Sequence, residues 1–542
     1  MLANTTSWAA ALCCASWLAL ATSASAQNPD VITYDIGVNG SDTNDIAYYG
    51  QSGGIAAYSI GTQSCNKGTT TVEWITAGGS THHPVIGQNM FRYKDGHFEH
   101  IGQSWLKHGF CAVNEIETFC APCHNTPCDS LGIGCADTYW ATLNDGGGGQ
   151  SKVNINAATG GHIHAGAPTG NATIRGRLQV AVSDIDPAQN PGAQYFIEGQ
   201  YVTQDDAAAG NAGNNASWRK VNVLAVNNID GGGVTHREEP AIFAWQDLDR
   251  DVKVREVKNV ENAGTKTTFL LGYRASDLGG GIWHYEYAIQ NLTSDQSAGS
   301  FVVPVPTAVN VTNIGFHDVN YHSGDPYDGT DWPGAKSAGV VSWATTPFAT
   351  NANANAIRWG TLYNFWFDAA SAPTTGPVTI GLFKPSVNTS QSVDNVLVPG
   401  DPRTPPPVGG PSVFANHGGA GSATMAPTTV TVPRFGSKMN ALVLSEGAPA
   451  LLGHAWRGAL EVSGARRSML LVGLGGPSEG TFNRMGEMLV APPIVRGKVD
   501  DLSFAIPDDA HLLGVTFSAQ AAVLTQEGWR LTNALDVTIG SN

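Results

Sequence analysis

Near its middle the chain reads Gly281-IWHYEYAI-Gln290, a run in which apolar and polar side chains alternate. Successive side chains of a β-strand point to opposite faces, so this alternation predicts a half-buried strand. It places the three aromatic residues of the run on one face and His284 with Glu286 on the other. Core packing is the expected role of the aromatic face, and a platform that stacks on sugars is the alternative if that face is exposed.

Similar runs recur along the chain and predict further strands: Tyr195–Thr203, Ala241–Gln246, Thr268–Arg274, Phe301–Pro306 and Leu362–Asp368. Asp95-Gly96 between two such flanks is typical of a β-hairpin turn. The 65 glycines and 29 prolines among 542 residues, with 14% charged residues, suit a turn-rich β protein. We therefore expect a mainly β fold of tandem antiparallel β-sandwich domains with a disulfide-rich N-terminal region.

The first residues have the pattern of an export signal. Trp8–Ala21 is an uncharged apolar run, and the A-x-A motif Ala24-Ser25-Ala26 follows it. The run is too short to span a bilayer, and no other apolar run is long enough. We expect cleavage before Gln27 and a secreted, extracellular or cell-surface location, with the periplasm as a further option.

Cysteines follow this leader in a tight group: Cys65, Cys111, Cys120, Cys123, Cys128 and Cys135. In an exported protein they predict three disulfides, and six cysteines allow 15 pairings. Cys120-Ala121-Pro122-Cys123-His124 also has the spacing of a covalent haem attachment site. The polar, proline-broken surroundings disfavour haem, which needs an apolar wrap and a second axial ligand. A zinc site on the same thiols is a further alternative.

Composition divides the chain into five predicted segments. They are a signal peptide at 1–26, a cysteine-rich region at 27–150, a main β-sandwich domain at 151–390, a Pro/Gly-rich linker at 391–427 and a C-terminal β-sandwich module at 428–542.

The net charge of −16 argues against nucleic acid as a partner, because phosphate backbones need clustered Lys and Arg. Cell-surface glycans or proteins are the partner classes that remain. Oligomeric state does not follow from the sequence.

The segment Phe316–Trp332 carries two histidines and four aspartates. Its glycines and Pro326 favour turns, which can gather His317, Asp318, His322 and Asp325 around one point. Imidazole and carboxylate groups ligate divalent cations, so these four residues are the predicted metal site. An Asx-rich surface loop is the alternative.

Other histidines cluster upstream: His82, His83, His97, His100, His108, His162 and His164. His97 and His100 would point to opposite faces of a strand, whereas His162 and His164 would share one. Four glutamates, Glu198, Glu238, Glu239 and Glu286, are candidates for a pair of glycosidase carboxylates. The chain has no Walker motif.

The ending Gly514-VTFSAQAAVLTQEGWRLTNALDVTIG-Ser541 resembles the C-terminal β-sandwich module of many secreted bacterial proteins. The N-terminal two-thirds resembles one uncharacterised family of planctomycetes and myxobacteria, on residues such as His83-PVIGQNMFRYKDGHFEHIGQSWLKHGF-Cys111 and Phe316-HDVNYHSGDPYDGTDW-Pro333. The resemblance implies an exported, multi-domain β protein and implies no activity.

Three functional hypotheses follow. The first is an exported protein with a structural or ligand-binding role and no catalysis. The second is a metal-dependent extracellular enzyme, hydrolase-like, that uses residues 316–332. The third is a c-type haem protein that uses Cys120, Cys123 and His124.

Overall fold

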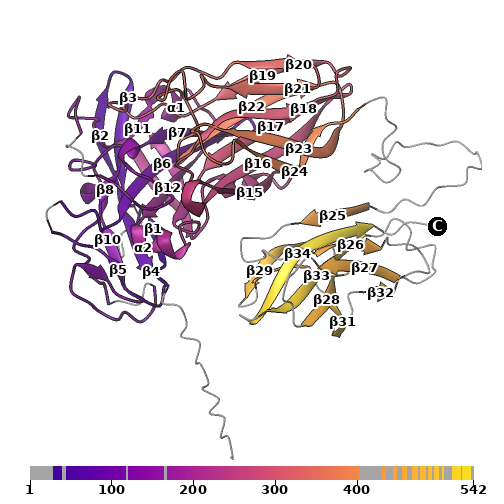
Figure 1. Ribbon diagram of the computed structural model, residues 1–542, viewed down its shortest axis with the longest axis horizontal. Helices are drawn as coiled ribbons and strands as arrows, with labels where there is room; N and C mark the ends of the chain where they lie inside the picture. The colour runs from indigo at the N-terminus through magenta and orange to yellow at the C-terminus, as the bar shows by residue number, and fades with distance from the viewer. Residues whose placement is uncertain are drawn as a thin grey trace, which may run out of the picture.

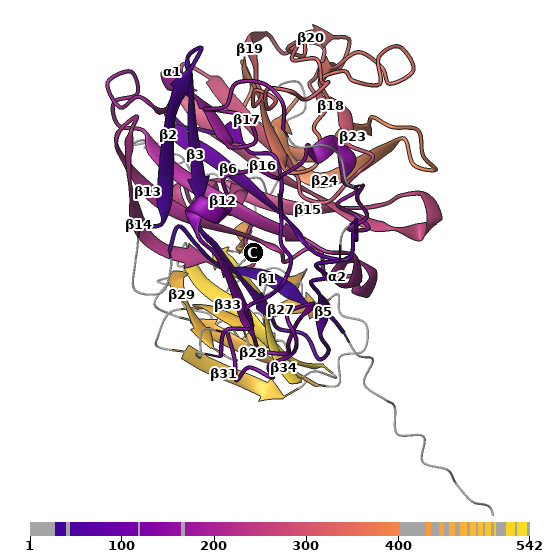
Figure 2. The same ribbon diagram turned by 90° about the vertical axis from the view of Figure 1, so that its left-hand side faces the viewer.

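The computed structural model describes residues 28–38, 44–77, 79–116, 120–163 and 168–401, and beyond them the strands β25 to β34 (Figures 1 and 2). The predicted signal peptide lies outside the described residues. The described part is mainly β, as the sequence predicts, and its described helices are short: α1 (Val182–Ile185), α2 (Gln204–Ala209) and α3 (Ile242–Leu248). No helix among the described residues is long and apolar enough to cross a membrane.

The N-terminal half is built on a nine-stranded sheet with the order β14-β13-β12-β6-β7-β11-β3-β2 and with β8 beside β6. The strands are β2 (Ile46–Ser52), β3 (Ile55–Ile60), β6 (Val85–Lys94), β7 (His97–Gln103), β8 (Lys107–His108), β11 (Leu178–Ala181), β12 (Gln194–Val202), β13 (Ala216–Ala225) and β14 (Asn228–His236). Smaller sheets accompany it: β1 (Val31–Ile36), β4 (Thr62–Asn66) and β10 (Ala136–Tyr139) form one, and β5 (Val72–Glu73) and β9 (Ser130–Leu131) the other. In the sequence, the glycine run 146–149 therefore falls between β8 and β11, which belong to the same nine-stranded sheet.

The predicted hairpin at Asp95-Gly96 is confirmed. Lys94 pairs with His97 across the turn, and Asp95 and Gly96 have φ angles of 52° and 93°. Positive φ at both central residues is the combination that a two-residue hairpin turn requires. The turn fixes His97 as the first residue of β7.

Two five-stranded antiparallel sheets form the next unit. The first contains β15 (Lys253–Val260), β16 (Lys266–Gly279), β17 (Ile282–Asn291), β22 (Thr361–Ala369) and β19 (Val311–His317). The second contains β20 (Gly334–Ser337), β21 (Val340–Ala344), β18 (Ala298–Pro304), β23 (Pro373–Leu382) and β24 (Ser390–Pro399). β24 extends into the segment predicted as a linker.

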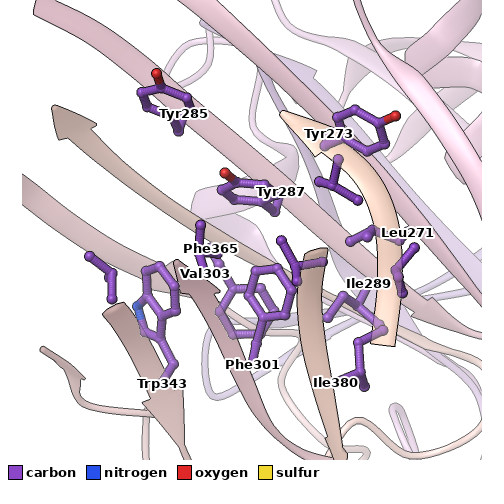
Figure 3. Close-up of a cluster of buried hydrophobic side chains, with 14 of the residues drawn as sticks. Leu271, Tyr273, Tyr285, Tyr287, Ile289, Phe301, Val303, Trp343, Phe365 and Ile380 are labelled. Atoms are coloured by element: carbon purple, nitrogen blue, oxygen red, sulfur yellow. The ribbon is translucent and has the colours of Figure 1, made fainter. Parts of the chain in front are cut away.

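One hydrophobic core joins these two sheets into a β-sandwich (Figure 3). Tyr287 from β17 meets Phe301 from β18 at a ring distance of 5.3 Å, and Phe301 meets Phe365 from β22 at 5.1 Å. Tyr285 and Tyr287 are wholly buried. The aromatic face of the run 281–290 is therefore core, as predicted, and the sugar-stacking alternative is wrong.

One predicted strand is a helix. Ala241–Gln246 was expected to be extended, but residues from Ile242 form α3. The free N–H groups at its start are bound by strand side chains, since Ala241 donates to Glu198 at 2.6 Å and Ile242 to Gln290 at 3.1 Å. A short apolar run does not by itself distinguish a strand from a buried helix, and here the side-chain partners favour the helix.

The C-terminal region contains three further antiparallel sheets. The strands are β25 (Val430–Arg434), β26 (Leu444–Ala448), β27 (Ala455–Leu460), β28 (Arg467–Gly473), β29 (Pro477–Asn483), β30 (Gly486–Val490), β31 (Ile494–Val499), β32 (Ser503–Ala505), β33 (Thr516–Thr525) and β34 (Gly528–Thr538). They pair only with one another among the described strands.

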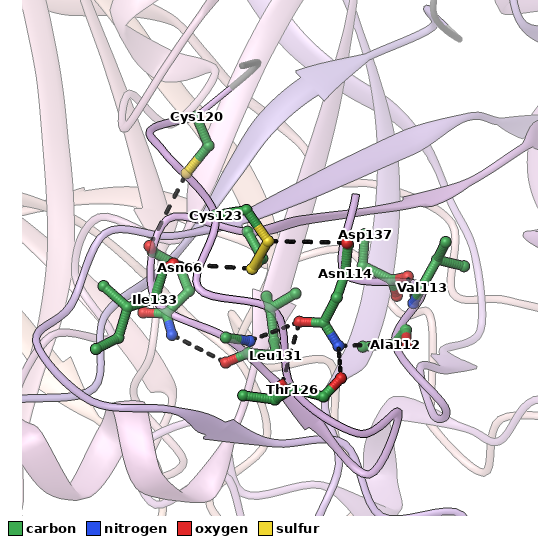
Figure 4. The surroundings of a disulfide bond; sticks show 12 residues. Asn66, Ala112, Val113, Asn114, Cys120, Cys123, Thr126, Leu131, Ile133 and Asp137 are labelled. Atoms are coloured by element: carbon green, nitrogen blue, oxygen red, sulfur yellow. Dashed lines mark hydrogen bonds between the residues drawn. A yellow bond between two sulfur atoms is a disulfide. The ribbon is translucent and has the colours of Figure 1, made fainter. Parts of the chain in front are cut away.

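All six cysteines of the N-terminal region are paired: Cys65–Cys120, Cys111–Cys128 and Cys123–Cys135. Around these bonds the Asn114 side chain ties neighbouring loops together (Figure 4). It accepts a hydrogen bond from Gly132 N at 2.7 Å and donates one to Ser130 O at 2.9 Å. The prediction of three disulfides is confirmed.

Candidate metal centres

Among the described residues, two groups of three side chains lie close enough together that each could hold a metal ion. The first is His83, His108 and His162, and the second is His97, His284 and Glu286. In each group, one ligand atom from each residue lies within 4.8 Å of the other two. We refer to them as the three-histidine centre and the sheet-junction cluster.

Strand pairing brings His83 and His108 together. His108 ends β8 and pairs with Val85 at the start of β6, two residues after His83. The intervening Pro84 accepts a hydrogen bond from Gly109 N at 2.9 Å. The His83 and His108 rings therefore sit on adjacent, hydrogen-bonded segments.

His162 reaches the same place from a distant loop. It forms an isolated β-bridge with Ile155, and its Nδ1 donates a hydrogen bond to Gly160 O at 3.3 Å. In that neutral tautomer Nε2 carries the lone pair that can bind a metal. Gly160 has φ of 69°, and a Cβ there would lie 2.3 Å from the backbone of Thr203, so only glycine fits this loop.

The three imidazoles of the three-histidine centre are in mutual contact. His83 Nε2 and His108 Nδ1 are 2.9 Å apart, and the His162 ring centroid lies 5.0 Å from that of His83 and 5.7 Å from that of His108. Nitrogens on one tetrahedral zinc ion lie about 3.4 Å apart, since each Zn–N bond is about 2.0–2.1 Å long. The His83–His108 contact is shorter than that spacing, and the ligand atoms of all three residues lie within 4.8 Å of one another.

The centre is buried but lies near the surface. His83, His108 and His162 are 3%, 5% and 8% exposed. The Phe110 ring packs edge-on against His83 at 5.3 Å and is itself 40% exposed. An apolar side chain at the rim restricts water and strengthens metal–ligand electrostatics inside.

The sheet-junction cluster is built differently, around one carboxylate. Glu286 on β17 is 1% exposed, and its two oxygens accept hydrogen bonds from His97 Nδ1 at 3.0 Å and from His284 Nε2 at 3.2 Å. The other ring nitrogen of His284 is 2.7 Å from Asp368 Oδ1 on β22. Asn364 also donates to Glu286, at 3.3 Å.

Ionisation in this cluster follows from the contacts. Burial alone would raise the pKa of Glu286, but hydrogen bonds from His284 and His97 lower it. Burial opposes the charged form of His97 and His284, yet their hydrogen bonds to carboxylates raise both pKa values. These contacts therefore favour the charged forms of the Glu286 carboxylate and of the two imidazoles.

The two predicted histidine ligands of the segment 316–332 have different surroundings. His317 is the last residue of β19, and burial lowers its pKa. His322 packs against the Trp105 ring at 5.2 Å, and burial lowers its pKa to about 4.

The predicted aspartate ligands have hydrogen-bond donors of their own. Asp318 accepts from Asn355, and Asp325 accepts from Ser151 and, at 2.9 Å, from Trp105 Nε1. Neither group of three candidate ligands among the described residues includes the four predicted residues. Cation binding by this segment stays a prediction.

The haem hypothesis conflicts with the disulfides. Cys120 is bonded to Cys65 and Cys123 to Cys135, so neither sulfur is left to form a thioether. Zinc binding by the same thiols fails for the same reason.

The candidate glycosidase acid Glu198 has a packing role. It is buried and accepts hydrogen bonds from Ala241 N, Asn89 and Gln290 at 2.6, 2.8 and 2.8 Å. Three donors on one carboxylate hold α3 against the sheets.

No family model matches the chain, and no curated protein matches it. Among solved structures, the dimeric latent PorU from Porphyromonas gingivalis aligns at 9% identity with a TM-score of 0.11. The alignment covers 95% of this chain and 34% of that one, so this chain spans about a third of that protein. A TM-score of this size supports no structural conclusion.

Proposed function

We propose that this chain is an exported, disulfide-stabilised β protein that binds a transition-metal ion through His83, His108 and His162, outside the cell or at its surface. One observation carries the proposal: three buried imidazoles from separate segments have ligand atoms within 4.8 Å of one another. A shared metal ion would account for the convergence of three histidines from such distant positions in the sequence.

The ligand set indicates the kind of metal. Imidazole suits zinc, copper, nickel and iron, whereas calcium and magnesium prefer oxygen ligands. Three protein ligands leave a fourth tetrahedral position for water or for a ligand atom from outside. A ligand-binding role is therefore the functional class that this centre supports.

Export is supported by two independent features. The leader has an apolar run followed by an A-x-A motif. The three disulfides are of a kind that forms and persists in oxidising compartments. N-terminal sequencing of the protein from its native host should begin at Gln27, and a sequence beginning at Met1 would refute export by this leader.

Metal binding is tested on the oxidised protein, purified with its disulfides intact, stripped with chelator and titrated with Zn²⁺ and Co²⁺. Tetrahedral Co²⁺ absorbs visible light far more strongly than octahedral Co²⁺, so the spectrum reports on this centre. We expect one strongly absorbing Co²⁺ per chain in the wild type. His83→Ala and His108→Ala should each abolish that absorption.

His82→Ala is the matched control. His82 precedes His83, but its side chain is about half exposed and bonds to Glu73 Oε2 at 2.7 Å. The control should bind Co²⁺ as the wild type does. The proposal is wrong if the wild type shows no tetrahedral Co²⁺ signal, or if His82→Ala loses it as fully as His83→Ala.

A further inference from the structure

We propose that the sheet-junction cluster is a second metal site, in which His97, His284 and Glu286 ligate the ion and Asp368 orients His284. This site lies apart from the three-histidine centre and uses none of its residues. The ligand class is a first-row divalent cation of the kind that two histidines and one carboxylate bind.

The first argument is convergence on one carboxylate. His97 begins β7 of the nine-stranded sheet, and Glu286 lies on β17 of the sandwich. Their contact of 3.0 Å and the His284–Glu286 contact of 3.2 Å match the spacing of donor atoms on one ion. Metal bonds of about 2.0–2.2 Å place neighbouring donors about 2.9–3.4 Å apart.

The second argument is the position of Asp368. Its carboxylate holds His284 Nδ1 at 2.7 Å, which directs His284 Nε2 toward Glu286. A carboxylate on the far nitrogen of a ligating histidine fixes the ring and its tautomer at many metal sites.

The third argument is access and rigidity. The His97 and His284 side chains are 26% and 14% exposed, so two of the three ligands reach solvent, while Glu286 is 1% exposed. The Trp366 ring packs edge-on against His97 at 5.0 Å, and Asn364 donates to both Glu286 and Phe98 O. The ligands are thus held from three strands.

The ligand composition selects the metal class. Two histidines and one carboxylate with open positions form the set found around non-haem Fe²⁺. With the open positions of the iron sites filled by water, Co²⁺ here should take five or six ligands, whereas we expect a tetrahedral ion at the three-histidine centre. The two sites should therefore differ in their Co²⁺ spectra.

The test uses the full chain with the first centre removed. The His83→Ala/His108→Ala variant, stripped and titrated with Co²⁺, should retain one ion per chain with the weak absorption of a five- or six-coordinate site. Adding His284→Ala should abolish this binding. Asp368→Asn should weaken it about 10–100-fold without removing it, as expected for an orienting carboxylate.

His236→Ala is the control within the same background. His236 also lies 3.7 Å from two acids, Glu239 and Asp247, but it belongs to neither group of candidate ligands. It should leave Co²⁺ binding unchanged. If the His83→Ala/His108→Ala variant binds no Co²⁺ while folded by circular dichroism, the second site is refuted and the first is unaffected.

A measurement on the wild type covers the case in which that variant fails to fold. Zn²⁺ should protect His97 and His284 from modification by diethylpyrocarbonate, as read by peptide mass spectrometry, and leave His236 reactive. Equal modification of His284 with and without Zn²⁺ would overturn the proposal. Protection of His83 and His108 alone would support only the three-histidine centre.

Discussion

The disulfide-tied N-terminal region and the junction between β7 and β17 both bury a carboxylate, but they compensate its charge in different ways. Asp137 accepts hydrogen bonds from neutral donors, Val113 N at 2.7 Å and Trp74 Nε1 at 3.0 Å, and burial raises its pKa to about 6. Glu286 faces two imidazoles that lower its pKa despite complete burial. In the first region, neutral N–H groups contact the buried carboxylate. At the junction between β7 and β17, two histidines contact it.

The difference explains what each metal site needs. The three-histidine centre offers three imidazoles and no carboxylate among its three candidate ligands. In the sheet-junction cluster, the carboxylates of Glu286 and Asp368 already pair with the imidazoles of His97 and His284. We expect metal removal to change the first centre more than the second, and loss of one charged partner to harm the second most.

The largest effect should come from Glu286→Gln in the metal-free protein. The substitution leaves the partly buried rings of His97 and His284 beside a neutral amide, and breaking an ion pair at a buried carboxylate costs about 3–5 kcal/mol. Urea unfolding in the presence of chelator measures the loss. Glu238→Gln, which breaks the exposed Lys67–Glu238 pair, should cost less than about 1 kcal/mol. Equal losses in the two variants would remove the contrast.

A second variant separates the regions by removing one disulfide. Cys111→Ser/Cys128→Ser opens a bond between residues 17 positions apart, which should cost about 3 kcal/mol by the chain-entropy relation. His108 lies three residues before Cys111, so Co²⁺ affinity at the three-histidine centre should fall. Weak Co²⁺ binding at the sheet-junction cluster should not change. If both sites weaken alike, the disulfide acts on the whole fold and not on one region.

Much of this architecture follows from local patterns. The alternation in Gly281–Gln290 correctly separates the core tyrosines from His284 and Glu286, because a strand has only two faces. The Asp95-Gly96 turn is equally local, since two positive φ angles demand such residues. Sequence also indicates that the cysteines pair, but only the fold selects among the 15 connectivities.

The candidate sites depend on contacts that no local pattern encodes. His83 and His108 meet through β6–β8 pairing, and His162 joins them across 54 further residues of sequence. The density of histidines between positions 82 and 164 is the signal in the sequence, but it does not say which of them converge. Glu286 and His97 come from different sheets. Strand alternation predicts the face of the strand on which each side chain lies, but it does not predict that the two side chains are in contact.

The pH dependence of stability offers a third test of the comparison. The pKa of Asp137 is about 6 in the folded protein and its ordinary value is 3.8, so the folded state binds the proton more tightly. The stabilisation is complete below about pH 4 and is lost as pH rises through about 6. Asp137→Asn should remove this dependence. The unfolding free energy of the variant minus that of the wild type should therefore be larger at pH 7 than at pH 4, by up to about 3 kcal/mol. Each unit of pKa difference is worth about 1.4 kcal/mol.

Urea unfolding at pH 4 and pH 7 measures that difference. Asp186→Asn is the control, since Asp186 is exposed and its hydrogen bonds with Gln189 and Ala188 lower its pKa. It should show no such gain at pH 7. A flat wild-type profile between pH 4 and 7 would mean that dipoles compensate Asp137 as well as histidines compensate Glu286.

The smallest effect on stability should come from cation binding by the segment 316–332, because hydrogen-bond donors already contact the carboxylates of the predicted site. Clustered carboxylates repel unless a cation or hydrogen-bond donors offset them. Asp318 has Asn355, and Asp325 has Ser151 and Trp105, so donors already supply part of that compensation. A cation here should bind weakly and raise the melting temperature by no more than about 2 °C.

The measurement needs both other centres removed, in the His83→Ala/His108→Ala/His284→Ala variant. Chelator should still lower its melting temperature slightly, and adding His322→Ala should abolish that sensitivity, although loss of the buried ring also lowers stability by itself. The comparison is therefore between melting curves with and without chelator in each variant. If chelator does not change the melting temperature of the triple variant, residues 316–332 form a structural loop. The hypothesis of a metal-dependent hydrolase that uses these residues is then unsupported.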